Sequence, residues 1–179
     1  FKTAGLKVFD VEQLSTHGGS LRVYAQRAES TRFDTCESVF RLRDEEASLG
    51  VASPAFYAGF QERSDRTKDD LMRFLVDAKR EGRQLVGYGA AAKGNTLLNY
   101  AGVRPDLMAY VVDNNPAKQG MYLPGSRIPI VDEQRIVDDP PDIVLVLPWN
   151  IRDEVAQRLG SLNGWSGTVV TAVPELRVG

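Results

Sequence analysis

The sequence predicts an α/β fold, in which a Rossmann-like parallel sheet with flanking helices follows a β-hairpin and linking helices. Three observations predict it. From residue 84 onward, short apolar runs alternate with helix-like stretches, as in strand–helix–strand units with right-handed crossovers. A glycine-rich turn follows the first of those runs. Before residue 30, two alternating runs flank a pair of glycines, as in an antiparallel hairpin.

Composition excludes several classes of protein. The 179 residues carry 22 basic and 24 acidic side chains, and a net charge of −2 argues against a nucleic-acid-binding tail or a membrane-surface domain. One cysteine and one histidine exclude a disulfide framework and a multi-cysteine or His-rich metal site. The sequence shows no bilayer-spanning apolar run and no signal peptide, so we expect a cytoplasmic protein without a metal site, a membrane partner or a nucleic-acid partner.

Residues 1–30 are predicted to be a hairpin that belongs to a larger sheet. The runs 7–14 and 20–27 alternate, and Gly18 and Gly19 give their connection the freedom it needs. An isolated two-stranded hairpin is marginally stable, and the residues after it offer no third strand. Residues 1–5 also look like the last turn of a helix capped by Gly5. Both features predict that the chain is a fragment of a longer protein.

Residues 31–82 are predicted to be linking helices. One helix covers 36–49, and a longer one begins with Ser53 as N-cap and Pro54 at the first helical position and runs to about residue 81. The charged run at 62–70 is either a break in this helix or a solvated face.

Residues 83–179 are predicted to be a Rossmann-like domain. Periodicity and turn residues divide it into alternating elements. We expect strands at 84–88, 108–113, 127–131, 142–147 and 167–172, with helices at 94–101, 133–138 and 151–162.

The glycine turn is the strongest candidate for a binding site. The spacing Gly87-x-Gly89-x-x-Ala92 fits a loose dinucleotide fingerprint. Amides at a helix start suit a phosphate, and Lys93 would add a positive charge beside them. A plain strand-to-helix turn with a surface lysine is an equally good interpretation of the motif alone.

Two more loops are expected at the same edge of the sheet, because ligands of open parallel sheets bind at the carboxyl ends of the strands. Asp113 follows the second strand at roughly the 20-residue spacing at which dinucleotide sites place a ribose-binding acid. The run Asp-Asn-Asn-Pro is also ordinary turn chemistry. Trp149 could stack on a base or sugar, or pack beneath its loop. Tyr88 could point at a ligand or cover the sheet.

Two polar residues of the hairpin are weaker candidates. His17 lies in a glycine turn, where a neutral imidazole could relay protons near pH 7, although a surface histidine is the simpler interpretation. Arg22 could pair with a phosphate or with Glu12 across the hairpin.

Several runs resemble one protein family. FDVEQLSTHGGSLRVYA at 9–25 is similar to the junction sequence of bacterial SAM-dependent sugar C-methyltransferases, and GYGAAAKGNTLLNY at 87–100, VVDNNPAKQG at 111–120 and PWN at 148–150 resemble their C-terminal domain. The resemblance covers nearly the whole chain. It implies three parts: a zinc-binding N-terminal module, a SAM-binding domain and a Rossmann-like C-terminal domain. The hairpin would then be the tail of the methyltransferase sheet, and the zinc cysteines, the SAM loop and the main acid/base cluster would lie upstream of Phe1.

The resemblance also implies a function. The full enzyme would methylate a carbon of a nucleotide-linked keto-sugar in deoxysugar biosynthesis. A base would remove the proton beside the ketone, and the enolate would attack the methyl group of S-adenosylmethionine. This chain would bind the sugar nucleotide, expected to be a TDP-sugar, against its own upstream domain, and would be inactive alone. The implied substrate-binding residues are Arg22, Gly87, Tyr88, Gly89, Ala90, Lys93, Gly94, Asn95, Asp113, Asn114, Pro148 and Trp149, with His17 as a catalytic candidate.

Two other functions fit the same residues. The chain could be a stand-alone Rossmann module that binds NAD or CoA and regulates a partner. It could also be a dimerisation domain with an empty site. Titration with NAD, CoA and a TDP-sugar would separate the three.

Overall fold

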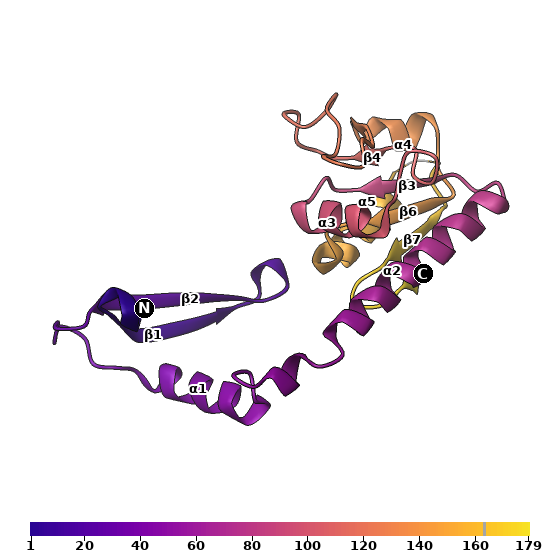
Figure 1. The fold of residues 1–179 in the computed structure, drawn as a ribbon. Coiled ribbons are helices and arrows are strands. Elements are labelled where there is room, and N and C mark those ends of the chain that lie inside the picture. Colours follow the sequence, from indigo (N-terminus) through magenta and orange to yellow (C-terminus); the bar gives the residue numbers. More distant parts are fainter. Residues whose placement is uncertain (163) are drawn as a thin grey trace. The chain divides into compact units, whose positions relative to one another are not determined.

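The structure of the chain is a computed structural model, and it describes residues 1–162 and 164–179 (Figure 1). The chain divides into two compact units, residues 1–60 and residues 61–179. The division falls inside the predicted linking region, so most of the second linking helix belongs to the same unit as the parallel sheet. The finer predicted boundaries at residues 30 and 82 stay predictions.

The first unit is built on the predicted hairpin. Strands β1 (Leu6–Leu14) and β2 (Ser20–Arg27) pair antiparallel, and the short helix η2 (Thr16–Gly18) connects them. A β-bulge near Phe9 breaks the simple alternation of β1, and the Phe9 carbonyl accepts a hydrogen bond of 2.8 Å from the amide of Cys36. The Phe9 and Phe33 rings stack with their centroids 4.6 Å apart. These contacts hold the start of α1 (Glu37–Leu49) against the hairpin.

Little apolar surface is buried in this unit. Among its described residues, Val39 is the one hydrophobic side chain in the buried class. Large hydrophobic side chains on both the hairpin and the helices stay exposed, as Leu21, Phe40 and Leu49 do. Because apolar burial is the main favourable term in folding, this unit contributes far less stability than the second one.

The prediction of one long helix from Ser53 to about residue 81 is wrong. Ser53 is an N-cap, and its hydroxyl accepts a hydrogen bond from the Ala55 amide, but the helix it caps is the short η3 (Pro54–Tyr57). The chain then turns at Gly59, which has a φ of 75°, and α2 (Phe60–Arg80) begins. The charged run at 62–70 is a helical face of α2 and causes no break.

The second unit is the predicted Rossmann-like domain. Its sheet has six strands in the order β5-β4-β3-β6-β7-β8. All neighbours are parallel except the last pair, in which β8 returns antiparallel beside β7. The elements are β3 (Leu85–Tyr88), α3 (Ala92–Ala101), β4 (Val111–Val112), β5 (Ile130–Val131), α4 (Gln134–Asp138), β6 (Ile143–Val146), η4 (Trp149–Ile151), α5 (Arg152–Gly160), β7 (Thr168–Thr171) and β8 (Arg177–Val178).

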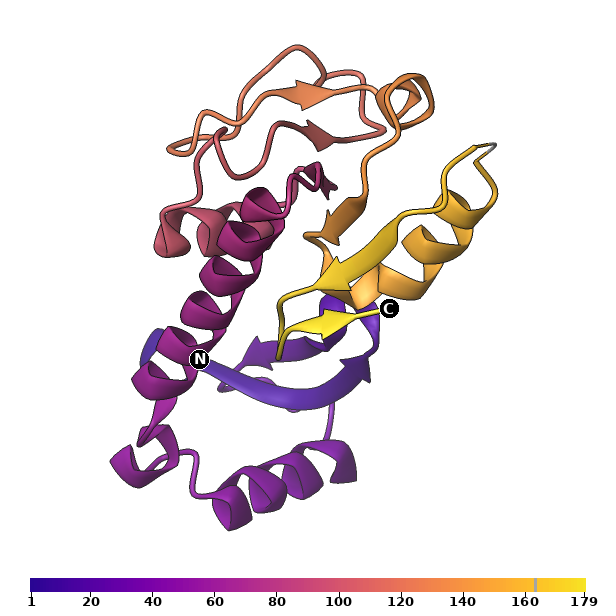
Figure 2. The same cartoon turned by 90° about the vertical axis from the view of Figure 1, so that its right-hand side faces the viewer.

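Helices cover both faces of this sheet, as Figure 2 shows for α2 on one side and α5 on the other. Leu71, Leu75 and Leu98 from α2 and α3 are fully buried in one core. Ile136 and Leu159 from α4 and α5 are fully buried in the other. Each such side chain stabilises the fold by roughly 1.5–3 kcal/mol. The central strands are buried on both faces, and this is why their sequences are continuous apolar runs.

The strands are shorter than predicted. The second predicted strand, 108–113, contains only the two-residue β4, and the third, 127–131, contains only β5. β8 was not predicted, because the alternating run after Pro174 covers only residues 175–178 and the strand itself has two residues. Helix α3 begins at Ala92, two residues before its predicted start.

Candidate functional site

The loops that follow β3, β4 and β6 lie at the carboxyl edge of the sheet, as the sequence predicts (Figure 1). Strand order reverses between β3 and β6, because β4 lies on one side of β3 and β6 on the other. Ligands of open α/β sheets bind at such a switch point. The candidate site is therefore built from the loops 89–95, 113–120 and 147–151.

The glycines of the first loop serve close packing within the protein. A Cβ on Gly89 would lie 2.7 Å from Pro148 Cδ, and a Cβ on Gly94 would lie 2.5 Å from Leu147 Cβ. Gly89 also has a φ of 83°, which disfavours any other residue. The turn after β3 and the loop after β6 are thus in direct contact. Packing alone accounts for these glycines, and a ligand role for them stays a prediction.

Asp113 organises the neighbouring loops. Its Oδ2 accepts hydrogen bonds from the Ala90 amide at 2.7 Å and from Lys118 Nζ at 3.0 Å, and its Oδ1 accepts one from the Asn115 amide at 2.9 Å. Burial by itself would raise the pKa of Asp113. Hydrogen bonds from the Asn115 amide, from Lys118 and from the Ala90 amide outweigh burial and hold that pKa below its usual range. These hydrogen bonds are the ones expected if Asp113 serves to form the turn. A hydrogen bond to a ribose would have to share the same two carboxylate oxygens.

Lys93 lies beside Trp149. Its Nζ is 5.8 Å from the centroid of the indole, within the range of a cation–π contact. Lys93 occupies the first turn of α3, where backbone amides have no partner inside the helix. The amide of Ala91 is already used, because it donates to the Gly89 carbonyl at 2.7 Å. A lysine and helix-start amides thus lie together, an arrangement that suits an anion.

Tyr88 covers the sheet. Its side chain is buried, and its hydroxyl donates a 2.5 Å hydrogen bond to Glu133 Oε1 and accepts one of 3.3 Å from Asn114 Nδ2. Arg158 from α5 donates to both oxygens of Glu133, with Nε at 2.7 and 2.9 Å. Burial and the hydrogen bond to Glu133 raise the pKa of Tyr88 to about 12. Tyr88, Asn114, Glu133 and Arg158 therefore form one network of hydrogen-bonded side chains.

Sequence reasoning missed Glu133 and Arg158. They come from separate elements that only the strand order brings beside Tyr88, so no local pattern indicates them. Glu133 is the first residue of the helix predicted at 133–138, but nothing in that pattern indicates a partner on α5.

Two hollows are lined by residues of the candidate-site loops. One, of about 380 Å³, lies between residues 90–95 and residues 117–124. The other, of about 740 Å³, lies between residues 149–154 and residues 171–178. Of the predicted site residues, Trp149 lines the larger hollow, and Ala90 and Asn95 line the smaller one. Sequence reasoning missed their other walls, which include Lys118, Met121, Tyr122, Arg152 and Arg177.

The hairpin candidates His17 and Arg22 belong to the first unit. Arg22 donates a 2.9 Å hydrogen bond to Glu12 Oε2, which is the pairing across the hairpin that the register allows. Tyr24 donates to the same carboxylate oxygen at 3.1 Å. His17 is exposed and has a φ of 57° within η2. Catalytic or substrate-binding roles for these two residues stay predictions.

Neither a metal centre nor a membrane span is found in the described parts of the chain. Within residues 1–162 and 164–179, no group of three or more His, Cys, Asp or Glu side chains could hold a metal ion. No helix among these residues is long and apolar enough to cross a membrane.

The fold defines a class of protein, the Rossmann-like α/β domains whose loops gather at the carboxyl edge of a mostly parallel sheet. Comparison with known proteins makes the class more specific. The profile of the family described as "C-methyltransferase C-terminal domain" matches residues 15–174. The C-methyltransferase NovU of Streptomyces niveus is 32% identical over 178 residues, which are 99% of this chain and 42% of NovU. The chain belongs to the C-methyltransferase C-terminal domain family and spans less than half the length of this relative.

Proposed function

We propose that the chain is the substrate-binding part of a SAM-dependent C-methyltransferase whose substrate is a nucleotide-linked keto-sugar. The carboxyl edge of its sheet would hold the nucleotide diphosphate and present the sugar to the methyl-transferring domain. Membership of the family supports the reaction class. The observation that carries the binding role is the pairing of Lys93 with the start of α3 at a topological switch point.

The parts of the site have distinct roles in this proposal. Lys93 and the first-turn amides of α3 neutralise the diphosphate. Trp149, held beside Lys93, offers an aromatic face to the substrate. Asp113 fixes the turn after β3 through the Ala90 amide, so the helix-start amides are preorganised before substrate arrives. S-adenosylmethionine would supply the electrophilic methyl group from a domain outside this chain.

Substitution of Lys93 tests the phosphate role. We expect Lys93→Ala to weaken binding of TDP and a TDP-sugar by about 10-fold, as loss of one charge-assisted contact of about 1.5 kcal/mol predicts. Isothermal titration calorimetry with this chain measures it, with NAD as the competing ligand. Lys79→Ala, on the exposed end of α2 in an ion pair with Asp106, is the matched control.

Each outcome separates the candidate functions. TDP binding that Lys93→Ala weakens and Lys79→Ala does not would support the proposal. Binding of NAD without TDP would favour a dinucleotide-sensing module. TDP binding that is unchanged by Lys93→Ala would remove Lys93 from the site.

A further inference from the structure

The smaller hollow, which we call the alanine pocket, has walls unlike those of a phosphate site. One wall is residues 90–92, a run of three alanines, and the other is residues 121–124. Lys118 is the one charged side chain lining it, and its Nζ is already bonded to Asp113 Oδ2 and to the Ala90 carbonyl at 3.1 Å. A pocket with short alanine side chains on one wall and apolar side chains on the other suits a flat, weakly polar group.

The wall formed by residues 121–124 is preformed. It belongs to a small backbone hairpin in which the Gly120 amide donates to the Ile130 carbonyl and the Leu123 amide donates to the Ile128 carbonyl, both at 2.9 Å. Asn99 of α3 donates to the Pro124 carbonyl at 2.9 Å and ties this hairpin to the helix. A ligand that enters the pocket therefore meets an ordered surface and incurs little ordering cost.

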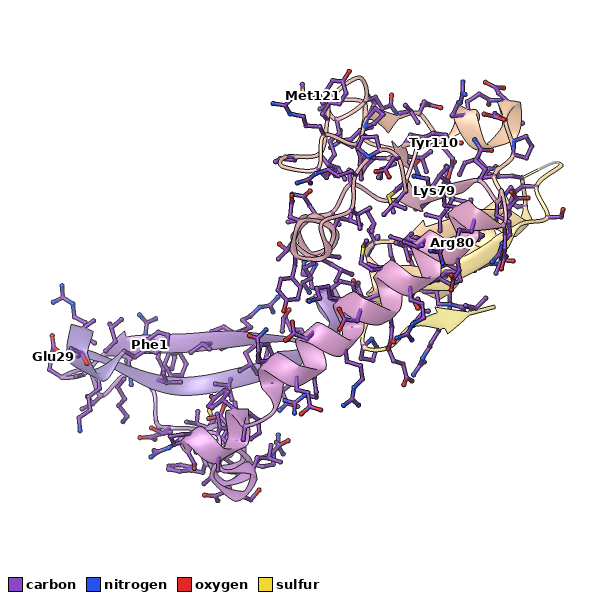
Figure 3. The ribbon with its side chains drawn as sticks, turned by 45° about the vertical axis from the view of Figure 1, so that its right-hand side comes forward. Phe1, Glu29, Lys79, Arg80, Tyr110 and Met121 are labelled. Atoms are coloured by element: carbon purple, nitrogen blue, oxygen red, sulfur yellow. The ribbon has the colours of Figure 1, made fainter. Side chains whose placement is uncertain are left out.

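Two large side chains on this wall are left in solvent. Met121 is 59% exposed and Tyr122 is 63% exposed, and Figure 3 shows Met121 on the loop beyond β4. Thioether and phenol groups both make favourable contacts with a planar ring. Because both side chains lie at the rim of the pocket, they are available to cover a ring that enters it.

We infer that the alanine pocket binds the nucleobase of the sugar nucleotide, with Tyr122 and Met121 packing on the ring and Asn95 supplying a hydrogen bond to its edge. This inference rests on the proposed function. Ala92 connects the alanine pocket to the proposed diphosphate site, because it lines the pocket and is also the first residue of α3. One nucleoside diphosphate could thus place its base in the pocket and its phosphates at the helix start.

Chemical-shift mapping tests the inference even at weak affinity. Amide spectra of ¹⁵N-labelled chain are recorded with TDP, inorganic pyrophosphate and glucose 1-phosphate. We expect TDP to shift the amides of 90–92 and 121–123 together with those of 93–95. Pyrophosphate and glucose 1-phosphate should shift 92–95 and leave 121–123 unchanged.

The variant Tyr122→Ala adds a quantitative test. Base–aromatic stacking predicts that TDP binds about 10-fold more weakly, while pyrophosphate affinity stays the same. Tyr57→Ala, which removes an exposed tyrosine from the first unit, should change neither affinity. Because Tyr122 lies mostly in solvent, its removal should leave the fold and its circular dichroism intact.

The possible failures are distinguishable. If TDP shifts 92–95 but not 121–123, or binds Tyr122→Ala as tightly as the wild type, the base pocket is excluded and the proposed function stands. If glucose 1-phosphate shifts 121–123 as TDP does, the pocket takes the sugar. If TDP shifts no amide, the proposed function fails and this inference fails with it.

Discussion

Tyr88 lies between two glycines in the sequence, but in the folded chain its hydroxyl lies against the Glu133–Arg158 ion pair. Strand alternation directs its ring to the face covered by α4 and α5. The hydroxyl then needs a buried partner, and Glu133 supplies one. Tyr88, the residue between the two glycines of the motif, thus stabilises the fold around the site through its hydrogen bond to Glu133.

Spectrophotometric titration should reveal Tyr88 as the last tyrosine to ionise. Its pKa of about 12 lies above the ordinary value of about 10, so the folded state favours the protonated phenol. The stabilisation is complete below pH 10 and is lost as pH rises from about 10 through 12. Absorbance at 295 nm should lose its latest transition in Tyr88→Phe.

The same variant should lower the free energy of unfolding at pH 7 by about 1–2 kcal/mol, because one hydrogen bond to a charged acceptor is lost while Arg158 still pairs with Glu133. Tyr57→Phe, on an exposed side chain, is the control for both measurements and should change neither. An unchanged late transition in Tyr88→Phe would show that another tyrosine carries it.

Among the elements, the loop after β4 and the turn after β3 act as one unit because Asp113 bonds to both. Lys118 strengthens the link, since it donates to Asp113 and to the Ala90 carbonyl. Gln119 extends it to the loop after β5 through a 2.9 Å hydrogen bond to Asp132. Three loops of the carboxyl edge are thereby held in one arrangement without a ligand.

Acid should release this link. The pKa of Asp113 is depressed in the folded chain, so its stabilisation is present above the unfolded pKa of about 3.9 and is lost as pH falls through the folded value. We expect Asp113→Asn to lower the free energy of unfolding by about 1–2 kcal/mol at pH 7 and by much less near pH 3. Urea unfolding at the two pH values measures the difference.

Asp153→Asn is the matched control, because that carboxylate pairs with Arg152 while its side chain is 95% exposed. Surface pairs of this kind contribute little, so its effect should be small at both pH values. An equal loss for Asp113→Asn at pH 7 and pH 3 would contradict a role for the charge.

The elements also show how far sequence reasoning reaches. Buried strands and helix caps are encoded locally, so the order of elements and the hairpin could be predicted from apolar runs and glycines. The break at Gly59 was missed, because the charged run at 62–70 was the one interruption considered in this helix. The Glu133–Arg158 pair and the alanine pocket depend on which strands become neighbours, and local sequence patterns do not determine the strand order.

For the whole molecule, the two units differ in how much core each contains. The second unit buries apolar side chains on both faces of its sheet, while Val39 is the buried hydrophobic side chain among the described residues of the first. The division between them falls after Phe60, at the start of α2, and the side chains of Leu71 and Leu75 farther along this helix are fully buried in the core of the second unit. Cooperative unfolding should therefore be a property of the second unit.

A fragment of residues 61–179 tests this directly. We expect it to unfold in one cooperative transition with a Tm within about 5 °C of the whole chain, because a shift of that size corresponds to about 1 kcal/mol for a domain of this length. Residues 1–60 alone should give a shallow, non-cooperative melt, since a two-stranded hairpin with one covering helix buries too little surface. Circular dichroism melts of the fragments and the whole chain provide the comparison. If residues 61–179 lost their cooperative transition, the sheet would depend on the first unit for its stability, and the proposed binding site would have to be assayed only in the intact chain.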